Sequence, residues 1–285
     1  MTLHMMILFA LKASIILSVF AIGLESLPGD AAYLLRRPGK LARSLLAMDV
    51  VMPLLAASIV AAFDLNAAVE VALVALAVSP APPVLPKKQI KAKGEPSYAI
   101  ALLLLAAAVA VIFIPVAMEL LGHFFQMPIS MQPWPIAELV LMTVFAPLAA
   151  GILVRRFLPA IALRISKTAA RVGAVALLLC FAPVLFTAWP AIVALIGNGA
   201  VVAIAAFVVA GLLVGHALGG PDSQDRTVLA LATATRHPGV ALAIATTNFP
   251  QQKAVLPAIL LYIILGAIIT IPYVLWRKRV AAREE

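Results

Sequence analysis

A charged and titratable cluster interrupts a long apolar stretch near the C-terminal end of the sequence. Arg236 and His237 lie between apolar runs at about 228–232 and 240–245, and Pro238 and Gly239 follow them directly. Proline removes a backbone donor and glycine relaxes the backbone, so we expect a helix arriving here to break and restart. A guanidinium offers forked donors that suit a carboxylate, and charge at membrane depth is typical of transport sites. A short loop outside the membrane is the alternative.

The composition is typical of a membrane protein. Of the 285 residues, 64% are hydrophobic and only 12% are charged, which excludes an ordinary soluble domain. We therefore expect an all-α polytopic membrane protein with one membrane domain over residues 1–285. The net charge of +9 would indicate nucleic acid in a soluble protein, but here the basic residues lie between apolar runs, so we expect no nucleic acid partner. The single Cys180 excludes a disulfide framework and a cysteine-based metal site, and we expect no metal and no cofactor.

A second interruption lies in the first half of the chain. Residues 67–78 are apolar, but as a helix they span only about 18 Å, too little for a hydrocarbon core of about 30 Å. Four prolines follow within eight residues and favour an extended chain. We expect a discontinuous span, half helix and half extended chain; a proline-rich surface loop is the alternative. Half-helices are expected to begin after the two breaks, at about 84–87 and at Gly239, and their N-terminal amides favour negative charge. The prolines expected to break the two interrupted segments are Pro80, Pro82, Pro83, Pro86 and Pro238.

The Lys and Arg residues set the expected topology. Nine apolar segments are expected at about 5–24, 44–63, 67–86, 97–121, 136–154, 172–188, 200–218, 227–247 and 254–276. All Lys and Arg except Lys12, Arg236 and Lys253 follow the odd-numbered segments, and links rich in these residues face the cytoplasm. Nine transmembrane segments in the plasma (inner) membrane fit this pattern. The N-terminus is then outside, and the tail at 277–285 is cytoplasmic.

The two interrupted segments occupy corresponding places in two halves of the chain, residues 1–130 and 131–276. Each precedes a long unbroken helix, and segments three and eight run in opposite directions. Paired breaks of this kind indicate an inverted-repeat secondary transporter, whose site lies where the two discontinuous, crossing segments meet.

Two short runs add a resemblance to a known family. Together with the paired breaks, the runs Met52-Pro-Leu-Leu-Ala56 and Gly239-Val-Ala-Leu-Ala243 resemble the bile acid:sodium symporter superfamily. The resemblance covers almost the whole chain in order and spacing. It implies a nine-helix form in which helices two, three, four, seven, eight and nine make a core that moves against a panel of helices one, five and six.

The chain departs from the family pattern at the places that ligate sodium. The family's first break typically reads Cys-Pro-Gly-Gly-Thr-Ala-Ser-Asn, and the Ser and Asn places fall here on Leu85 and Pro86. Its second break typically reads Glu-x-Gly-x-Gln-Asn-Ser-Gly, and the Glu and Gln places fall on Ala232 and Arg236. The Gln of helix two falls on Met48. A guanidinium cannot ligate sodium, so the resemblance implies the fold without the two sodium sites.

The resulting hypothesis is a sodium-independent secondary transporter that moves a small organic anion across the lipid bilayer by alternating access. We expect Arg236 to pair with Asp49, the most deeply placed acidic residue of a core helix. His237 is the candidate for proton coupling, with a structural histidine as the alternative. A non-transporting membrane sensor or partner subunit on the same scaffold is the competing hypothesis, and an enzyme is not expected. The residues expected to bind substrate are Arg236, His237, Ser79, Thr233, Thr235 and Gly239.

Overall fold

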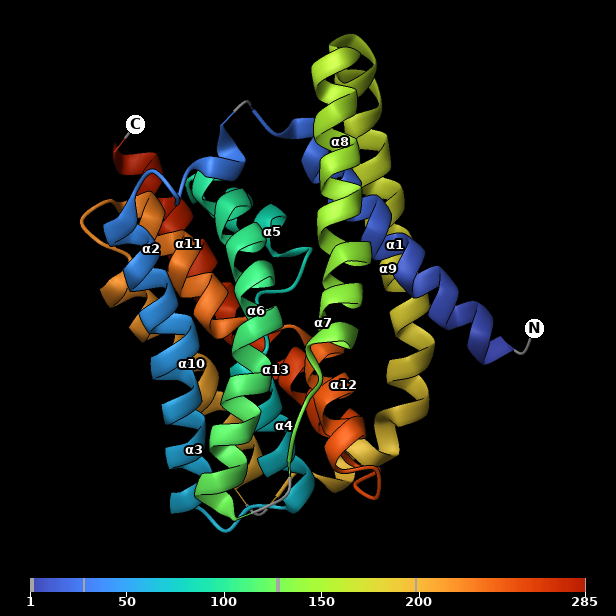
Figure 1. Cartoon of the computed structure of the whole chain (residues 1–285), viewed down its shortest axis with the longest axis vertical. Coiled ribbons are helices and arrows are strands. Elements are labelled where there is room, and N and C mark those ends of the chain that lie inside the picture. The colour runs from blue at the N-terminus through green and yellow to red at the C-terminus, as the bar shows by residue number, and fades with distance from the viewer. Residues whose placement is uncertain (1–2, 28, 127–128, 198, 285) are drawn as a thin grey trace.

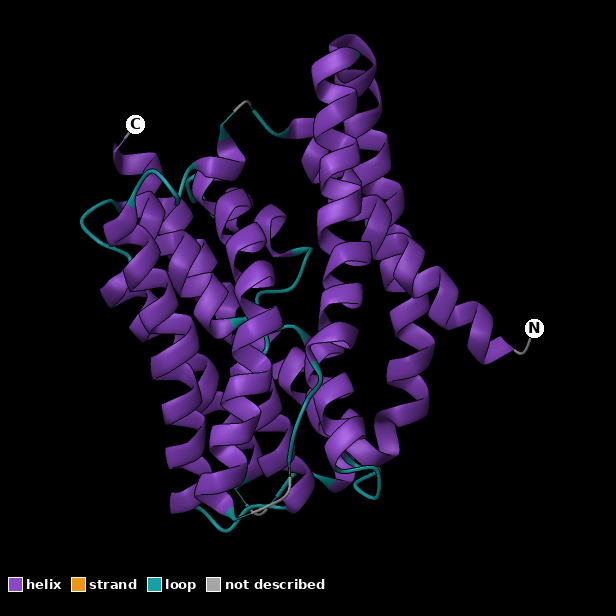
Figure 2. Ribbon diagram, viewed as in Figure 1, coloured by secondary structure: helices purple, strands orange, loops and turns teal. Residues whose placement is uncertain are grey.

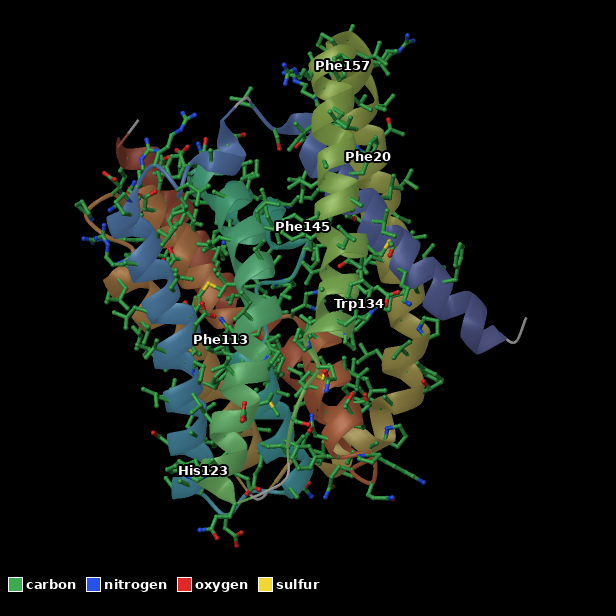
Figure 3. The ribbon with its side chains drawn as sticks, in the orientation of Figure 1. Phe20, Phe113, His123, Trp134, Phe145 and Phe157 are labelled. Carbon is green, nitrogen blue, oxygen red and sulfur yellow. The ribbon has the colours of Figure 1, made fainter. Side chains whose placement is uncertain are left out.

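The computed structural model describes residues 3–27, 29–126, 129–197 and 199–284, and within these ranges it is helical with no strand. Its long helices run roughly along the longest axis of the molecule (Figure 1). Figure 3 places Phe157, at the end of one helix, and His123, near the end of another, at opposite ends of the molecule. The two terminal residues, Met1 and Glu285, lie outside the described residues, although the expected repeat and tail include them.

Four helices form one side of the molecule. α1 (Leu3–Glu25) packs against both α8 (Ala146–Phe157) and α9 (Pro159–Ala194). α7 (Pro133–Val140) continues into α8 through a π-helical turn at Leu141–Phe145. A Cβ atom added to Gly151 would lie 2.8 Å from the Cα atom of Gly23, so α1 and α8 approach closely because both residues are glycines. We call α1, α7, α8 and α9 the panel.

The remaining helices pack together on the other side and form the core of the fold (Figure 1). α6 (Pro96–Phe125) is long and unbroken, whereas α11 (Ser223–Ala234) and α12 (Pro238–Asn248) share one interrupted segment. α11 is the most buried of these, since every residue from Thr227 to Ala234 is buried. The core helices are α2 (Pro38–Leu45), α3 (Met52–Ala62), α4 (Ala67–Val78), α5 (Leu85–Lys91), α6 (Pro96–Phe125), α10 (Ala200–Leu218), α11 (Ser223–Ala234), α12 (Pro238–Asn248) and α13 (Val255–Glu284).

Seven helical stretches of the described chain are long and apolar enough to cross a membrane, and α4 is a further, shorter apolar helix. The fold is therefore that of an all-α polytopic membrane protein. The seven stretches are 38–62, 96–124, 133–157, 159–194, 200–218, 223–248 and 255–283.

The structure corrects three expected boundaries. α9 begins at Pro159 rather than near residue 172, because its first turns are helical although they carry basic residues. α13 continues to Glu284, so most of the expected tail is helix. The first break is not half extended chain, because α5 forms directly after it. Pro86 lies in the first turn of α5, where the missing N–H has no helical partner to lose, so it starts a helix instead of breaking one.

A π-helical turn joins α2 to α3 at Leu46–Val51, and Pro53 explains it. Within this turn the Met52 N–H bonds to the Ala47 carbonyl, five residues back. The Met48 carbonyl should take the next such bond from residue 53, but proline has no N–H. The sequence thus leaves the Met48 carbonyl free to accept a hydrogen bond from elsewhere in the core.

Candidate functional site

The two breaks meet in the interior of the molecule. The first lies between α4 and α5, and the second lies between Ala234, the end of α11, and Pro238, the start of α12. The backbone N–H of His237 donates a hydrogen bond of 2.8 Å to the Pro80 carbonyl. α4 packs against α12, and α5 packs against α11. Figure 2 shows both breaks as short loops surrounded by helices.

Arg236 is the largest fully buried side chain of the described residues, with 1% of its surface exposed. Its Nε donates to the Leu76 carbonyl at 3.2 Å, and its Nη2 donates to the carbonyls of Ala77 and Met48, the latter at 3.0 Å. Leu76 and Ala77 lie in the last turn of α4, where carbonyls lack the usual helical partner and carry partial negative charge; the Leu76 carbonyl also accepts from Ser79 at the C-cap. Arg236 therefore neutralises the C-terminal end of the first half-helix.

Two features of other helices complete this arrangement. The Met48 carbonyl, which accepts a hydrogen bond from Arg236, is the one that Pro53 leaves without a helical partner. From α13, the Tyr262 hydroxyl accepts a hydrogen bond of 2.6 Å from the Arg236 backbone N–H and donates one of 2.9 Å to the Ala234 carbonyl. Tyr262 thereby satisfies backbone groups on both sides of the second break.

The expected direct pair between Arg236 and Asp49 is not formed. Although both residues are described, no ion pair joins them, and Asp49 lies only within Coulombic range of the guanidinium. The reason is that Nε and Nη2 already donate hydrogen bonds to backbone carbonyls of α4 and of the π-helical turn between α2 and α3. The third guanidinium nitrogen, Nη1, is buried and finds no hydrogen-bond partner among the described residues.

His237 has a structural contact of its own. Its Nδ1 accepts hydrogen bonds from the backbone N–H groups of Gly239, at 3.1 Å, and Val240, at 3.3 Å. The imidazole thus caps the N-terminus of α12, which Pro238 begins in its first turn. A ring nitrogen that accepts two N–H groups carries no proton, so the cap requires an Nδ1 that is unprotonated.

The other expected substrate residues divide into buried and accessible ones. Ser79 is buried and donates to the Leu76 carbonyl at 2.7 Å. Thr233 is buried and donates to the Gly211 carbonyl of α10 at 2.5 Å, so it fastens α11 to α10. Thr235 is half-buried and Gly239 is exposed, and these two are the accessible positions of the set. Pro80, Pro82 and Pro83 lie between α4 and α5, as expected of residues that break a helix.

The short helix α5 carries polar side chains into the core that sequence reasoning assigned to a surface link. Lys88 Nζ donates to Thr270 Oγ1 of α13 at 2.6 Å, and Gln89 Nε2 donates to the Val228 carbonyl of α11 at 2.8 Å. The Lys87 ammonium is buried as well. The position of these lysines directly after Pro86, inside an interrupted segment, is the signal that would have found them.

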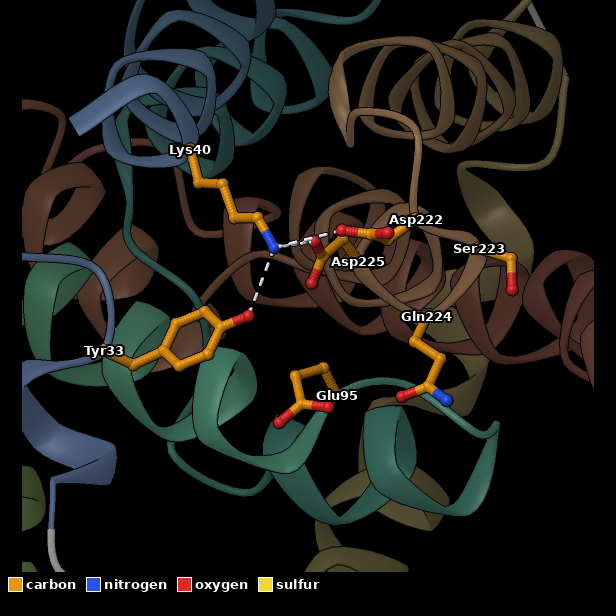
Figure 4. A pocket seen from close by; sticks show the side chains of 7 residues that line it. All are labelled: Tyr33, Lys40, Glu95, Asp222, Ser223, Gln224 and Asp225. Carbon is orange, nitrogen blue, oxygen red and sulfur yellow. Dashed lines mark hydrogen bonds and ion pairs between the residues drawn. The ribbon is translucent and has the colours of Figure 1, made fainter. Parts of the chain in front are cut away.

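A second polar cluster lies at the N-terminal end of α11. Lys40 Nζ contacts Asp225, Asp222 at 3.3 Å and the Tyr33 hydroxyl at 3.2 Å (Figure 4). An open pocket of about 280 Å³ lies beside them, and Glu95 and Gln224 contribute to its wall. Asp225 is 1% exposed, so Lys40 balances a buried carboxylate. The cluster fastens α2 to α11 and belongs to the packing of the core.

Nowhere in the described part of the chain do three His, Cys, Asp or Glu side chains gather as a metal site would require.

Comparisons with known proteins identify the family. A search of curated proteins gave no match. The sequence model described as Sodium Bile acid symporter family matches residues 13–210, which is more than half of the chain. This match includes most of the panel, the first break and the π-helical turn that Arg236 contacts, and it agrees with the apolar helices of the fold. The chain belongs to the sodium bile acid symporter family and is a membrane transporter of that type.

Proposed function

We propose that this protein is a secondary active transporter of a small organic anion that works by alternating access without sodium. The observation that carries the proposal is the guanidinium of Arg236 on the carbonyls of Met48, Leu76 and Ala77. Sodium requires oxygen ligands, and a fixed cation already takes these carbonyl oxygens. The side-chain oxygens that the family resemblance would require are replaced by Ala232, Leu85 and Pro86.

The proposal includes nine transmembrane segments. The seven apolar stretches account for seven of them, α1 for another, and the interrupted segment α4–α5 for the ninth. The segments α4–α5 and α11–α12 would cross at their breaks, in support of which His237 contacts Pro80. The first repeat is then 1–130 and the second is 131–276. The N-terminus lies outside the inner membrane and the C-terminus in the cytoplasm.

The substrate site in this proposal lies at the breaks, where the core faces the panel. Thr235 and Gly239 are the accessible positions there, and Arg236 supplies a fixed positive charge behind them. Ser79 and His237 hold the backbone of the breaks in place through their hydrogen bonds, and Thr233 fastens α11 to α10 before the second break. An anion is favoured over a neutral solute because the site carries positive charge that backbone carbonyls neutralise only in part.

Proton coupling at His237 is the alternative to a purely structural histidine. A proton on Nδ1 would turn an acceptor into a donor and release both cap bonds. Proton binding would therefore be linked to a change at the start of α12, the half-helix that follows the second break. We assign the cap as the role of His237.

Counterflow uptake by purified protein in liposomes tests the proposal. Liposomes loaded with an unlabelled carboxylate should accumulate the same labelled compound in potassium medium, and liposomes without protein should not. Binding of a carboxylate without any counterflow would contradict transport and favour the competing hypothesis of a membrane sensor. Exchange of neutral solutes with no preference for anions would contradict the substrate class.

A further inference from the structure

Lys87 is a buried cation whose partner the structure does not supply. Its Nζ has almost no exposed surface and no hydrogen-bond partner among the residues that the structure describes. The adjacent Lys88 donates to Thr270, and Lys91 at the end of the same helix is exposed. An ammonium taken out of water without a partner is unfavourable, so its retention in a short core helix calls for a group that pairs with it.

The position of Lys87 indicates what this group is. α5 belongs to the core and follows the first break directly. The carboxylate that lies within Coulombic range of Lys87 is Glu25, the last residue of α1, which belongs to the panel. Glu25 is exposed and does not reach the ammonium to form an ion pair. Figure 1 draws α5 between α6 and the panel helix α8, so Lys87 lies in a core helix next to the panel, where core and panel must move relative to each other in alternating access.

Arg236 is not available to bind an anionic substrate directly. The guanidinium is fully buried, and its Nε and Nη2 bind carbonyls, so an anion cannot reach most of its donors without displacing them. A lysine, by contrast, is a compact charge with three donors on a flexible stem, and it can follow a ligand.

We infer that Lys87 binds the carboxylate of the transported substrate. One buried ammonium without a partner suits one carboxylate, so the substrate class is a monocarboxylate. The inference rests on the proposed function, because it names a residue and a substrate class for the same transport site.

The test uses uptake into liposomes by the full-length protein, with labelled cholate, benzoate and butyrate and their neutral amides as competitors. Lys87→Gln should raise the half-saturation concentration of the transported acid by about tenfold or more, since it removes a charge-assisted hydrogen bond. Lys87→Arg should recover most of the affinity. Lys91→Gln removes the same charge from an exposed position of the same helix and should leave the half-saturation concentration unchanged.

The melting temperature separates binding from a structural role. Because Lys87 has no partner in the empty protein, Lys87→Gln should melt at the wild-type temperature or above. A clear fall in melting temperature would overturn the inference, and so would an unchanged half-saturation concentration for an acid that the wild type transports. Uptake of none of the acids by the wild type would instead contradict the proposed function, and the inference with it.

Discussion

The backbone N–H of His237 donates to the carbonyl of Pro80, and this 2.8 Å hydrogen bond joins the two breaks of the chain. Proline supplies a carbonyl at a place where no helix uses it, and the break before Pro238 supplies an N–H that precedes the helical bonds of α12. Each interrupted segment therefore satisfies a backbone group of the other. The two breaks form one unit, with Arg236 buried at its centre.

Replacing Arg236 should destabilise the protein, and an additional substitution of Asp49 should not restore the lost stability. Arg236→Ala leaves the buried carbonyls of Met48 and Ala77 without this donor, whereas the Leu76 carbonyl still accepts from Ser79; we expect a loss of about 2–5 kcal/mol in the free energy of unfolding. The double change Arg236→Ala with Asp49→Ala should be no more stable than the single change, because carbonyls and not the carboxylate hold the guanidinium. Thermal melting in detergent measures both variants.

The control for this prediction is Arg171→Ala, which removes an exposed arginine from α9 and should change stability by less than about 0.5 kcal/mol. Recovery of the wild-type melting temperature in the double variant would show that a buried ion pair, and not the carbonyls, fixes Arg236.

Two variants of His237 distinguish its role as the N-cap of α12 from a role in proton coupling. Asparagine also accepts N–H groups at an N-cap but does not titrate, so His237→Asn should keep the stability and the pH profile of uptake between about pH 5 and 8. His237→Ala should lose about 1 kcal/mol of stability, because the N–H groups of Gly239 and Val240 lose their acceptor. A pH-dependent wild type with a pH-independent Asn variant would instead identify His237 as the proton carrier.

Interrupted helices of this chain could be predicted from local signals. Proline and glycine beside Arg236, and the prolines after the short helix at 67–78, act within a few residues of where they stand, so both breaks were expected where the structure has them. The half-helix expected to begin at about residues 84–87 is α5, which begins at Leu85, but Pro86 was expected to break a helix rather than to start one. Pro86 is compatible with a first helical turn, which a count of prolines does not reveal.

The partners of Arg236 could not be predicted from the sequence. The sequence indicates Asp49 as a partner because it is a charged side chain in a core helix. The structure instead gives Arg236 backbone carbonyls, which every residue has and which no sequence pattern marks. Pro53 was a usable signal, because it frees one particular carbonyl, that of Met48. Tyr262 gave no such signal, since its place at the second break depends on the packing of α13 against α11.

The panel depends on the close approach of α1 and α8. Gly151→Val should destabilise the protein by about 1–3 kcal/mol, because the new side chain would meet the backbone of Phe20 and Gly23. Gly39→Val is the control, since a Cβ atom at Gly39 meets no atom within 4 Å. Equal melting temperatures for the Gly151 variant and the wild type would mean that the two helices do not pack as the structure has them.

Lys40 should contribute to stability through a buried carboxylate. Lys40→Ala leaves Asp225 without its cation, and we expect a loss of about 3 kcal/mol. Adding Asp225→Asn to that variant should recover part of the loss, since the amide that remains is neutral. A loss that is the same with and without Asp225→Asn would contradict the pairing. Thermal melting of the two variants provides the comparison.

The most direct test of the account compares anion uptake in sodium and in potassium. Initial rates are measured in liposomes with equal concentrations of one cation or the other on both sides. The account predicts equal rates and equal melting temperatures in the two media, because Arg236 already binds carbonyl oxygens at the breaks and its positive charge would repel a sodium ion there. Uptake that rises and saturates with sodium, together with a higher melting temperature in sodium than in potassium, would contradict it.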